Sequence, residues 1–309
     1  MSKEVVLLFA GQGAQKVGMG RDLSETYPVA NELLQRAEAV VGYDLQKIMF
    51  EGPMEELTRT SRCQPALYIH GLAILAALKQ QVPDLKIAAT AGLSLGEFTA
   101  HAAAGTFDFE TGLRLVFQRG SFMEEACEQT QGSMAALVGG EESAVRELAA
   151  ECDVDVANLN APGQIVLSGS VEGIKAAMAK AKEKGIRKAV ELSVAGAYHS
   201  RLMKSAQDRL ATVLESTEIR TPSVPVVCNY EARVVNSPAE IRSTLASQVT
   251  GSVRWSESMQ LLLSQGQTFF LELGPGGVLS GLMGRIQKGT KVLCIEDAKS
   301  LEAAVAELQ

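Results

Sequence analysis

The chain has 309 residues, of which 46% are hydrophobic and 21% charged, the balance of a globular protein that can bury a large core. A formal net charge of −7 excludes a general attraction to nucleic acid or to an anionic membrane surface, so no partner of either kind is expected. The five cysteines are scattered and form no C-x-x-C pair, which argues against a disulfide framework or a metal site and favours a reducing, cytoplasmic location.

The outer parts of the chain alternate short β-branched runs with longer helical patterns, which is typical of a parallel sheet covered by helices. We expect strands at residues 5–9, 87–91, 224–229, 268–273 and 291–295. Apolar residues at three- and four-residue spacing predict helices at residues 66–79, 109–127, 201–214 and 239–249. The longest apolar stretch, residues 66–78, is interrupted by His70 and Gly71 and is too short to span a bilayer.

The middle of the chain follows a different pattern. The expected elements are a strand at 134–138, a helix at 141–150, strands at 154–159 and 164–168, a helix at 171–184 and a strand at 187–193. The order β-α-β-β-α-β is that of a ferredoxin-like unit. The sequence therefore predicts an α/β protein in which a ferredoxin-like domain, residues 128–197, is inserted into a large α/β domain formed by residues 1–127 and 198–309.

One segment matches a catalytic pattern. Residues 92–96 read Gly-Leu-Ser-Leu-Gly and fit the nucleophile-elbow pattern G-x-S-x-G, with Ser94 at its centre. A predicted strand precedes this segment and a helical pattern follows it. Glycines permit the tight backbone of such a turn, and the free N–H groups at the start of the helix favour a developing oxyanion. The plainer interpretation is a glycine-rich turn with an idle serine, but the context favours Ser94 as a nucleophile.

Only three histidines are available as the base that a serine nucleophile requires. His101 lies seven residues beyond Ser94 on the same predicted helix, about 10 Å along its axis and too far to touch it. His70 lies inside an apolar run, where a packed core histidine is expected. His199 follows a predicted strand and the flexible segment 195–197, a place where catalytic side chains are often presented. By elimination His199 is the base, and its orienting partner is left open as a backbone carbonyl or an amide.

A glycine-rich turn, residues 11–15 (Gly-Gln-Gly-Ala-Gln), follows the first predicted strand. The dinucleotide pattern G-x-G-x-x-G would need glycine where the chain has Lys16, and the P-loop pattern fails because Gly18 is followed by Met19. The turn is better suited to offering backbone N–H groups to an oxyanion.

Seven short segments, taken in order, carry a more specific signal. They are residues 9–15 (Phe-Ala-Gly-Gln-Gly-Ala-Gln), 64–67 (Gln-Pro-Ala-Leu), 92–97 (Gly-Leu-Ser-Leu-Gly-Glu), 118–123 (Gln-Arg-Gly-Ser-Phe-Met), 160–164 (Asn-Ala-Pro-Gly-Gln), 198–199 (Tyr-His) and 272–276 (Glu-Leu-Gly-Pro-Gly). In combination they resemble the malonyl-CoA:acyl carrier protein transacylase family of fatty acid synthesis, over the whole length of the chain. That family has an α/β-hydrolase-like large domain and a ferredoxin-like small one, in agreement with the predicted insertion.

The resemblance implies a serine-ester mechanism. Ser94 would take the malonyl group from coenzyme A, and His199 would shuttle the proton. The backbone N–H groups of Gln12 and Leu95 would form the oxyanion hole. The main chain of Gln248 would hold the catalytic imidazole.

The resemblance also implies how the substrate is recognised. Arg119 would clamp the free carboxylate of the malonyl group, while Gln64 and Asn160 would line the site. Malonyl-CoA and the phosphopantetheine-bearing acyl carrier protein would be the partners, no metal or other cofactor would be needed, and the enzyme is expected to be a monomer. Leu93 departs from the family, which most often has a histidine at this position that does not act as the base.

Three other functions compete with this one. A serine hydrolase of the α/β class would need an acid between the serine and the histidine, for which Asp153, Asp155 and Glu191 are candidates. A catalytically silent protein that only docks the acyl carrier is a second possibility, against which the intact nucleophile, base and arginine argue. An acyltransferase of methylmalonyl or polyketide type is the nearest competitor.

Overall fold

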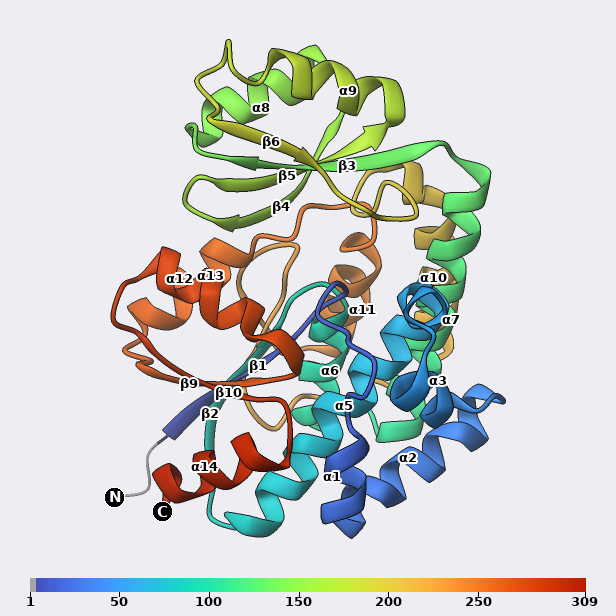
Figure 1. Ribbon diagram of the computed structural model, residues 1–309, viewed down its shortest axis with the longest axis vertical. Coiled ribbons are helices and arrows are strands. Elements are labelled where there is room, and N and C mark those ends of the chain that lie inside the picture. Colours follow the sequence, from blue (N-terminus) through green and yellow to red (C-terminus); the bar gives the residue numbers. More distant parts are fainter. Residues whose placement is uncertain (1–3) are drawn as a thin grey trace.

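A mixed six-stranded sheet forms the centre of the larger part of the molecule in the computed structural model, which describes residues 4–309 (Figure 1). In order across the sheet, the strands are β10 (Lys291–Ile295), β9 (Phe269–Leu273), β1 (Glu4–Phe9), β2 (Lys86–Gly92), β7 (Val226–Val227) and β8 (Val234–Val235). Neighbouring strands are parallel except β8, which runs antiparallel to β7.

The central strand β1 divides the interior into two cores. Its residues 5, 7 and 9 pack into one core, and residues 6 and 8 pack into the other, because successive side chains of a strand point to opposite faces. All five are buried, as expected for a parallel strand covered on both faces. This position places the end of β1 beside the end of β2, where the glycine-rich turn and the serine turn meet.

The first core is filled by most of the helices. They are α1 (Arg21–Thr26), α2 (Pro28–Val41), α3 (Leu45–Glu51), α4 (Met54–Thr58), α5 (Thr60–Gln81), α6 (Leu95–Ala103), α7 (Phe109–Gln129), α10 (Lys204–Ser216), α11 (Pro238–Ser247) and α14 (Ala298–Leu308), with the short 3-10 turn η1 (Arg201–Met203). The second core is covered by α12 (Trp255–Ser264) and α13 (Val278–Ile286), the latter preceded by the 3-10 turn η2 (Pro275–Gly277).

A second, antiparallel sheet lies above the first (Figure 1). Its strands follow the spatial order β4 (Asp155–Ala161), β5 (Gln164–Ser170), β3 (Gly132–Val138) and β6 (Lys188–Glu191). Helices α8 (Glu142–Glu151) and α9 (Val171–Lys180) pack on one face and form a separate core. The other face turns toward the larger part, since Met134, Ala157 and Val166 join the first core.

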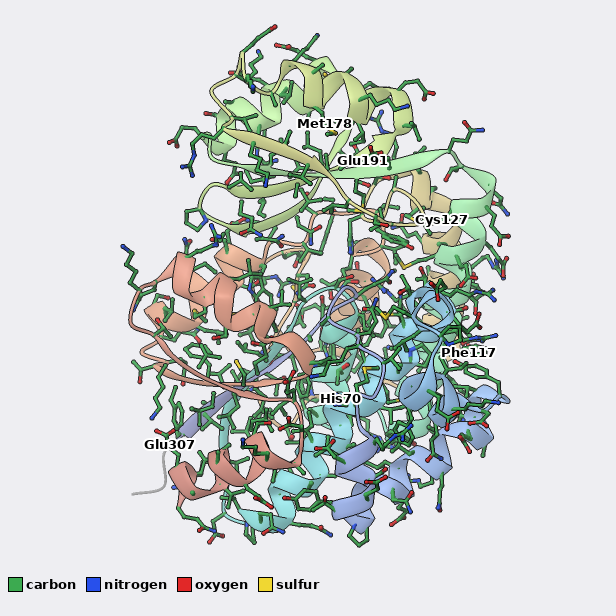
Figure 2. All side chains as sticks on the ribbon, viewed as in Figure 1. His70, Phe117, Cys127, Met178, Glu191 and Glu307 are labelled. Atoms are coloured by element: carbon green, nitrogen blue, oxygen red, sulfur yellow. The ribbon has the colours of Figure 1, made fainter. Side chains whose placement is uncertain are left out.

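Two connections join the sheets. Helix α7 leads directly into β3, and Cys127 near the end of this helix lies at the junction (Figure 2). The outer edge of β4 is bound to the segment before α12, where Leu159 N donates to Val253 O at 2.9 Å and Val253 N donates to Ala157 O at 2.8 Å. These hydrogen bonds hold the small sheet against the carboxyl ends of the strands of the large sheet.

Most predicted elements are present, with shifted ends. The strand predicted at 224–229 is reduced to β7, because Pro225 has no N–H to donate and the chain after Val227 turns toward the serine. The helix predicted at 66–79 begins earlier, at Thr60, and includes Pro65. The four helices between residues 21 and 58, the strand β8 and the helices α12, α13 and α14 were not predicted. Between residues 4 and 309, no helix combines the length and apolarity needed to cross a membrane.

Candidate active site

Ser94 occupies the sharp turn between β2 and α6. Its backbone has φ 54° and ψ −107°, a conformation that costs a non-glycine residue about 1–3 kcal/mol unless its surroundings hold it. The flanking glycines make the turn possible. A Cβ on Gly96 would lie 2.1 Å from Phe9 O, and one on Gly92 would lie 2.0 Å from the backbone of Gly96. The hydroxyl of Ser94 therefore projects from the start of α6 into the space between the two sheets.

Asn229 holds this turn from the neighbouring strand. Its Oδ1 accepts from Ser94 N at 2.6 Å and its Nδ2 donates to Gly92 O at 2.8 Å, so one side chain binds both sides of the turn. The asparagine is fully buried. Sequence reasoning placed Asn229 at the end of a strand and gave it no role. A polar residue at the carboxyl end of a parallel strand was the available signal.

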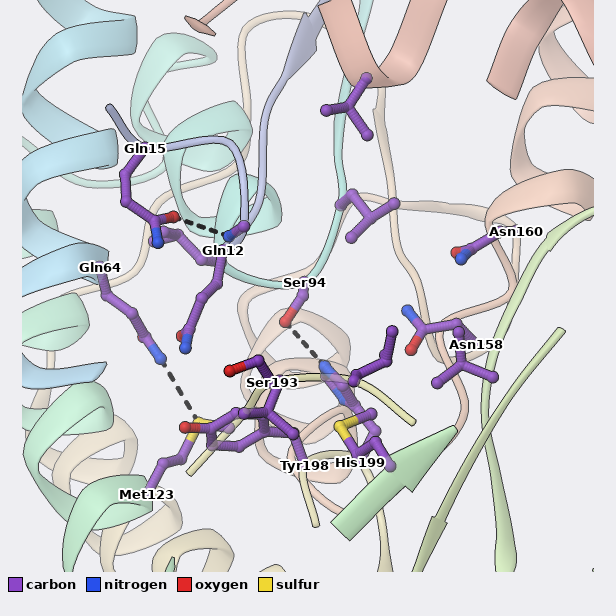
Figure 3. A pocket seen from close by; sticks show the side chains of 18 of the residues that line it. Gln12, Gln15, Gln64, Ser94, Met123, Asn158, Asn160, Ser193, Tyr198 and His199 are labelled. Carbon is purple, nitrogen blue, oxygen red and sulfur yellow. Dashed lines mark hydrogen bonds between the residues drawn. The ribbon is translucent and has the colours of Figure 1, made fainter. Parts of the chain in front are cut away.

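The imidazole of His199 lies against the serine. Ser94 Oγ and His199 Nε2 are 2.7 Å apart, and the two side chains point toward one another (Figure 3). His199 Nδ1 is 2.8 Å from Gln248 O, which can only accept, so Nδ1 carries the proton and Nε2 is free to accept from the hydroxyl. Burial, and then the charge of Arg119, lower the pKa of His199 to about 4. The ring is thus neutral at physiological pH, as a general base must be.

The other histidines have structural contacts. His70 lies in the interior of the larger part, where its Nε2 is 3.1 Å from Glu296 O (Figure 2). His101 is fully buried, with its Nδ1 3.1 Å from Thr106 Oγ1. Neither forms a hydrogen bond with Ser94 in the described part of the chain, and burial lowers the pKa values of both.

The acids that a hydrolase would require have other partners. Asp153 and Asp155 both accept from Arg201, and Glu191 accepts from Ser133 Oγ at 2.9 Å. The imidazole nitrogen that a triad acid would bind is instead occupied by a backbone carbonyl. The geometry therefore does not support a Ser-acid-His triad built from these three residues.

Arg119 reaches the serine from α7. The side chain is fully buried, and its guanidinium lies over the ring of Phe98. Its Nη2 donates to Ser94 Oγ at 3.1 Å and to Gln248 Oε1 at 2.9 Å, and its Nη1 donates to Gln64 Oε1 at 2.7 Å. Burial lowers the pKa of the guanidinium to about 10, so it remains charged at neutral pH. A permanent positive charge thus stands beside the nucleophile with its donors directed to neutral groups.

Glu97 is a negative group that is connected to Arg119 through the side chain of Gln248. Its Oε2 accepts from Gln248 Nε2 at 2.6 Å and from Asn229 N at 2.9 Å, and Gln248 passes the connection on to Arg119. Burial raises the pKa of Glu97 to about 7, against the hydrogen bonds and the arginine charge, which lower it. Sequence reasoning missed this residue too, although it is the last letter of the Gly-Leu-Ser-Leu-Gly-Glu segment.

Two residues beside Ser94 have backbone N–H groups that are not used within the protein. Among residues 4–309, the N–H groups of Gln12 and Leu95 donate no hydrogen bond to another protein group. Both residues line the cavity that contains Ser94. The loop that carries Gln12 is held by Gln15, whose Oε1 accepts from Gly13 N at 2.7 Å. Free donors held near a serine hydroxyl are suited to stabilising a tetrahedral oxyanion.

Ser94, His199 and Arg119 line a cavity of about 260 Å³ between the two sheets. Gln12 and Gln64 lie on one side, and Asn158 and Asn160 reach in from β4 on the other (Figure 3). Asn160 Oδ1 is buried and has no protein partner in the described part of the chain, which leaves it available to a ligand. The remaining lining is largely apolar, including Leu93, Met123, Met134, Val166, Leu192, Val194, Val278 and Leu282. No cluster of three metal-ligating side chains occurs between residues 4 and 309.

Comparisons with known proteins agree with this chemistry. The acyl transferase domain family matches residues 6–302. A malonyl CoA-acyl carrier protein transacylase from Bacillus subtilis is 40% identical, over 100% of this chain and 98% of its own length. An acyl carrier protein S-malonyltransferase from Vibrio cholerae has a TM-score of 0.94 and 37% identity, covering 98% of this chain and 100% of the other.

A further solved structure is that of a malonyl-transacylase in complex with a type II polyketide acyl-carrier protein. It has a TM-score of 0.94 and 37% identity, and it covers 99% of this chain and 100% of that one. The chain is therefore an acyltransferase and belongs to the acyl transferase family, among the malonyl CoA-acyl carrier protein transacylases.

Proposed function

We propose that this enzyme transfers the malonyl group of malonyl-CoA to the phosphopantetheine thiol of an acyl carrier protein through an ester on Ser94, and so supplies fatty acid synthesis. The observation that carries the proposal is the position of Arg119. A fully buried guanidinium within 3.1 Å of the nucleophile is unfavourable for a neutral acyl group and favourable for one that ends in a carboxylate.

In the first half-reaction, His199 Nε2 takes the proton of Ser94 as Oγ attacks the thioester carbonyl. The N–H groups of Gln12 and Leu95 hold the oxyanion, and one such donor typically lowers the barrier by about 3 kcal/mol. The carbonyl of Gln248 stabilises the imidazolium, which then returns its proton to the departing thiolate of coenzyme A. The products are free coenzyme A and a malonyl-serine ester.

The second half-reaction runs the same steps in reverse. His199 deprotonates the carrier thiol, which attacks the ester, and Ser94 recovers its proton. These proton transfers need no Asp or Glu beside His199, because the carbonyl of Gln248 orients its imidazole.

The malonyl carboxylate would bind the guanidinium of Arg119 in place of the Ser94 hydroxyl, which by then carries the acyl group. Gln64 would keep Arg119 in position and Asn160 would contribute a polar contact from the opposite wall. A methylmalonyl or polyketide-type substrate also presents a carboxylate, so this clamp alone does not separate these acyltransferases.

We also propose how the chain is divided into domains. Residues 1–127 and 198–309 form an α/β-hydrolase-like domain, for which the serine turn between β2 and α6 is the support. Residues 128–197 form a ferredoxin-like domain, supported by the element order βαββαβ and the strand order β4-β5-β3-β6. We place the enzyme in the cytoplasm. We expect it to act as a monomer, because one chain supplies every group of the site.

Intact-protein mass spectrometry tests the proposal. Incubation with malonyl-CoA should add one malonyl group to the parent protein and none to Ser94→Ala, which should also lose at least about 10⁴ in turnover. The ester should persist in water and disappear on addition of a pantetheine thiol, whereas a hydrolase would lose it in water. Label that still accumulates on Ser94→Ala would show that another residue is the nucleophile.

A further inference from the structure

The proposed function assigns no role to the buried side chain of Glu97. Glu97 touches neither Ser94 Oγ nor His199 in the described contacts, yet its side chain is fully buried at the centre of the site. Two N–H groups donate to its Oε2, from Asn229 N at 2.9 Å and from Gln248 Nε2 at 2.6 Å, and Gln248 Nε2 also donates to Ser94 O at 3.0 Å. A buried carboxylate is costly and calls for a charge partner.

The partner is Arg119, reached through one amide. Gln248 accepts from the guanidinium with its Oε1 and donates to the carboxylate with its Nε2, so the amide dipole is aligned between the two charges. Above pH 7 the carboxylate of Glu97 is ionised in the unloaded site and balances the charge of the guanidinium. Their balance is upset when a substrate brings its own carboxylate to the guanidinium, because one buried positive charge then faces two negative ones.

We propose that Glu97 is the resident counter-charge of Arg119, and that binding of a carboxylate-bearing acyl group at Arg119 is coupled to the uptake of one proton by Glu97. The inference rests on the proposed function for the substrate carboxylate. The proton comes from solvent and is accepted by Oε1, which has no hydrogen-bond partner in the described part of the chain, so the contacts of Oε2 are kept. Glu97 acts through Gln248 and Arg119 and is therefore a positioning residue.

Other titratable groups around Glu97 do not compensate the added charge. Burial and the proximity of Glu97 raise the pKa of the Cys228 thiol, which is therefore neutral. His199 is also neutral, because burial and Arg119 lower its pKa. Glu97 itself is poised for the exchange, since burial raises its pKa to about 7 even before a second anion arrives. A neighbouring negative charge raises the pKa of a carboxyl group further.

The test is the equilibrium of the first half-reaction between pH 7 and pH 8.5, above the pKa of Glu97 in the unloaded site. Intact-protein mass gives the ratio of malonyl-enzyme to free enzyme at fixed malonyl-CoA and coenzyme A. Uptake of one proton makes this equilibrium constant fall with rising pH, by up to tenfold per pH unit. In Glu97→Gln, which mimics the protonated acid, the constant should be independent of pH and should exceed that of the parent at pH 8. A purely structural defect would lower it at every pH.

Two controls sharpen the result. Glu272→Gln makes the same change at another fully buried glutamate, which accepts from Leu279 N and Ser280 N outside the site, and it should keep the parent's pH dependence. Acetyl-CoA, which lacks the carboxylate, should give a pH-independent equilibrium with the parent. The parent and acetyl-CoA measurements remain decisive if Glu97→Gln does not fold.

The possible failures are distinct. A parent constant for malonyl transfer that does not change with pH, or an unchanged pH dependence in folded Glu97→Gln, overturns the coupling. Absence of any malonyl ester on Ser94 would overturn the proposed function instead.

Discussion

At the scale of single residues, we expect the buried charge of Arg119 to determine which acyl groups the site accepts. Its two terminal nitrogens donate to two amides and a hydroxyl, its Nε has no partner, and no carboxylate binds it directly in the described part of the chain. A planar guanidinium can form two parallel hydrogen bonds with a carboxylate. Each charge-assisted bond contributes about 1.5–3 kcal/mol, which is enough to separate malonyl from acetyl by about 10²-fold or more.

Arg119→Ala should therefore reduce kcat/KM for malonyl-CoA by at least about 10²-fold, while transfer of acetyl is unchanged or improved. Arg119→Lys should recover only part of the malonyl activity, because a point charge cannot make the bidentate contact. The measurement is kcat/KM for both thioesters in the parent and both variants. Equal losses for the two substrates would mean that the residue is structural and that the carboxylate clamp is wrong.

At the scale of elements, the turn between β2 and α6 is strained and needs support from its neighbours. Asn229 provides two hydrogen bonds to it from the end of β7. Asn229→Ala removes both and leaves Ser94 N and Gly92 O unpaired, so we expect unfolding to become easier by about 1–3 kcal/mol. Turnover should fall more than substrate affinity, because the serine loses its fixed position. Urea denaturation and steady-state kinetics measure the two effects.

The exposed Asn236 offers a matched control for that substitution. Asn236→Ala should change stability by less than about 0.5 kcal/mol and leave turnover at the parent's level. If Asn229→Ala behaved like this control, the turn would be held by other contacts.

Two glycines in helices should respond in opposite ways to the same change. Gly96→Ala places a Cβ 2.1 Å from a backbone oxygen of β1, so α6 must move away and the folded yield and activity should collapse. Gly284→Ala, on α13, meets no atom within 4 Å and should stabilise the protein by about 0.5–1 kcal/mol. Thermal unfolding and activity of both variants check this. A well-folded, active Gly96→Ala would contradict the close packing of α6 on β1.

The limits of sequence reasoning also lie at this scale. Strands such as β1 and β9 were predicted because a continuous apolar run is visible without knowledge of its partners. Ser94 and His199 were proposed as a pair because a local motif and the scarcity of histidines singled them out, and their side chains lie 2.7 Å apart. Asn229 and Glu97 were not, since their roles exist only when segments distant in sequence meet. Reasoning from the residues alone left the orienting partner of His199 open, because the partner lies 49 residues away, and only the family resemblance implied the main chain of Gln248.

At the scale of the whole molecule, the three histidines make stability depend on pH. Burial lowers the pKa to about 4 for His70 and His199 and to about 3 for His101, whereas the unfolded chain binds these protons near pH 6.5. Between these values the unfolded state holds more protons, so stability is lost as the pH falls below about 6.5. Glu97 acts in the opposite sense, because its raised pKa lets the folded state hold a proton between about pH 4.5 and 7.

Three histidines outweigh the two carboxyls whose pKa values burial raises, Glu97 and Glu272, so the unfolding temperature should decrease when the pH is lowered from 6.5 to 5. Each histidine contributes at most about 1.4 kcal/mol per pH unit. His101→Gln removes one titrating group and should make this decrease less steep. An unfolding temperature that is constant or rises on acidification would show that the buried histidines do not set the pH response.

The order of strands in the large sheet has a consequence for the synthesis of the protein. Strand β1 is synthesised before the other strands of this sheet and lies between β2 and β9, and β9 begins only at residue 269. At about 5–20 residues per second, roughly 10–35 s separate the translation of β2 from that of β9. During this time one edge of a very apolar strand has no native neighbour, and the catalytic groups cannot yet be complete. The nascent chain is therefore vulnerable to aggregation for most of its translation, and it is in this interval that protection by a chaperone would matter most.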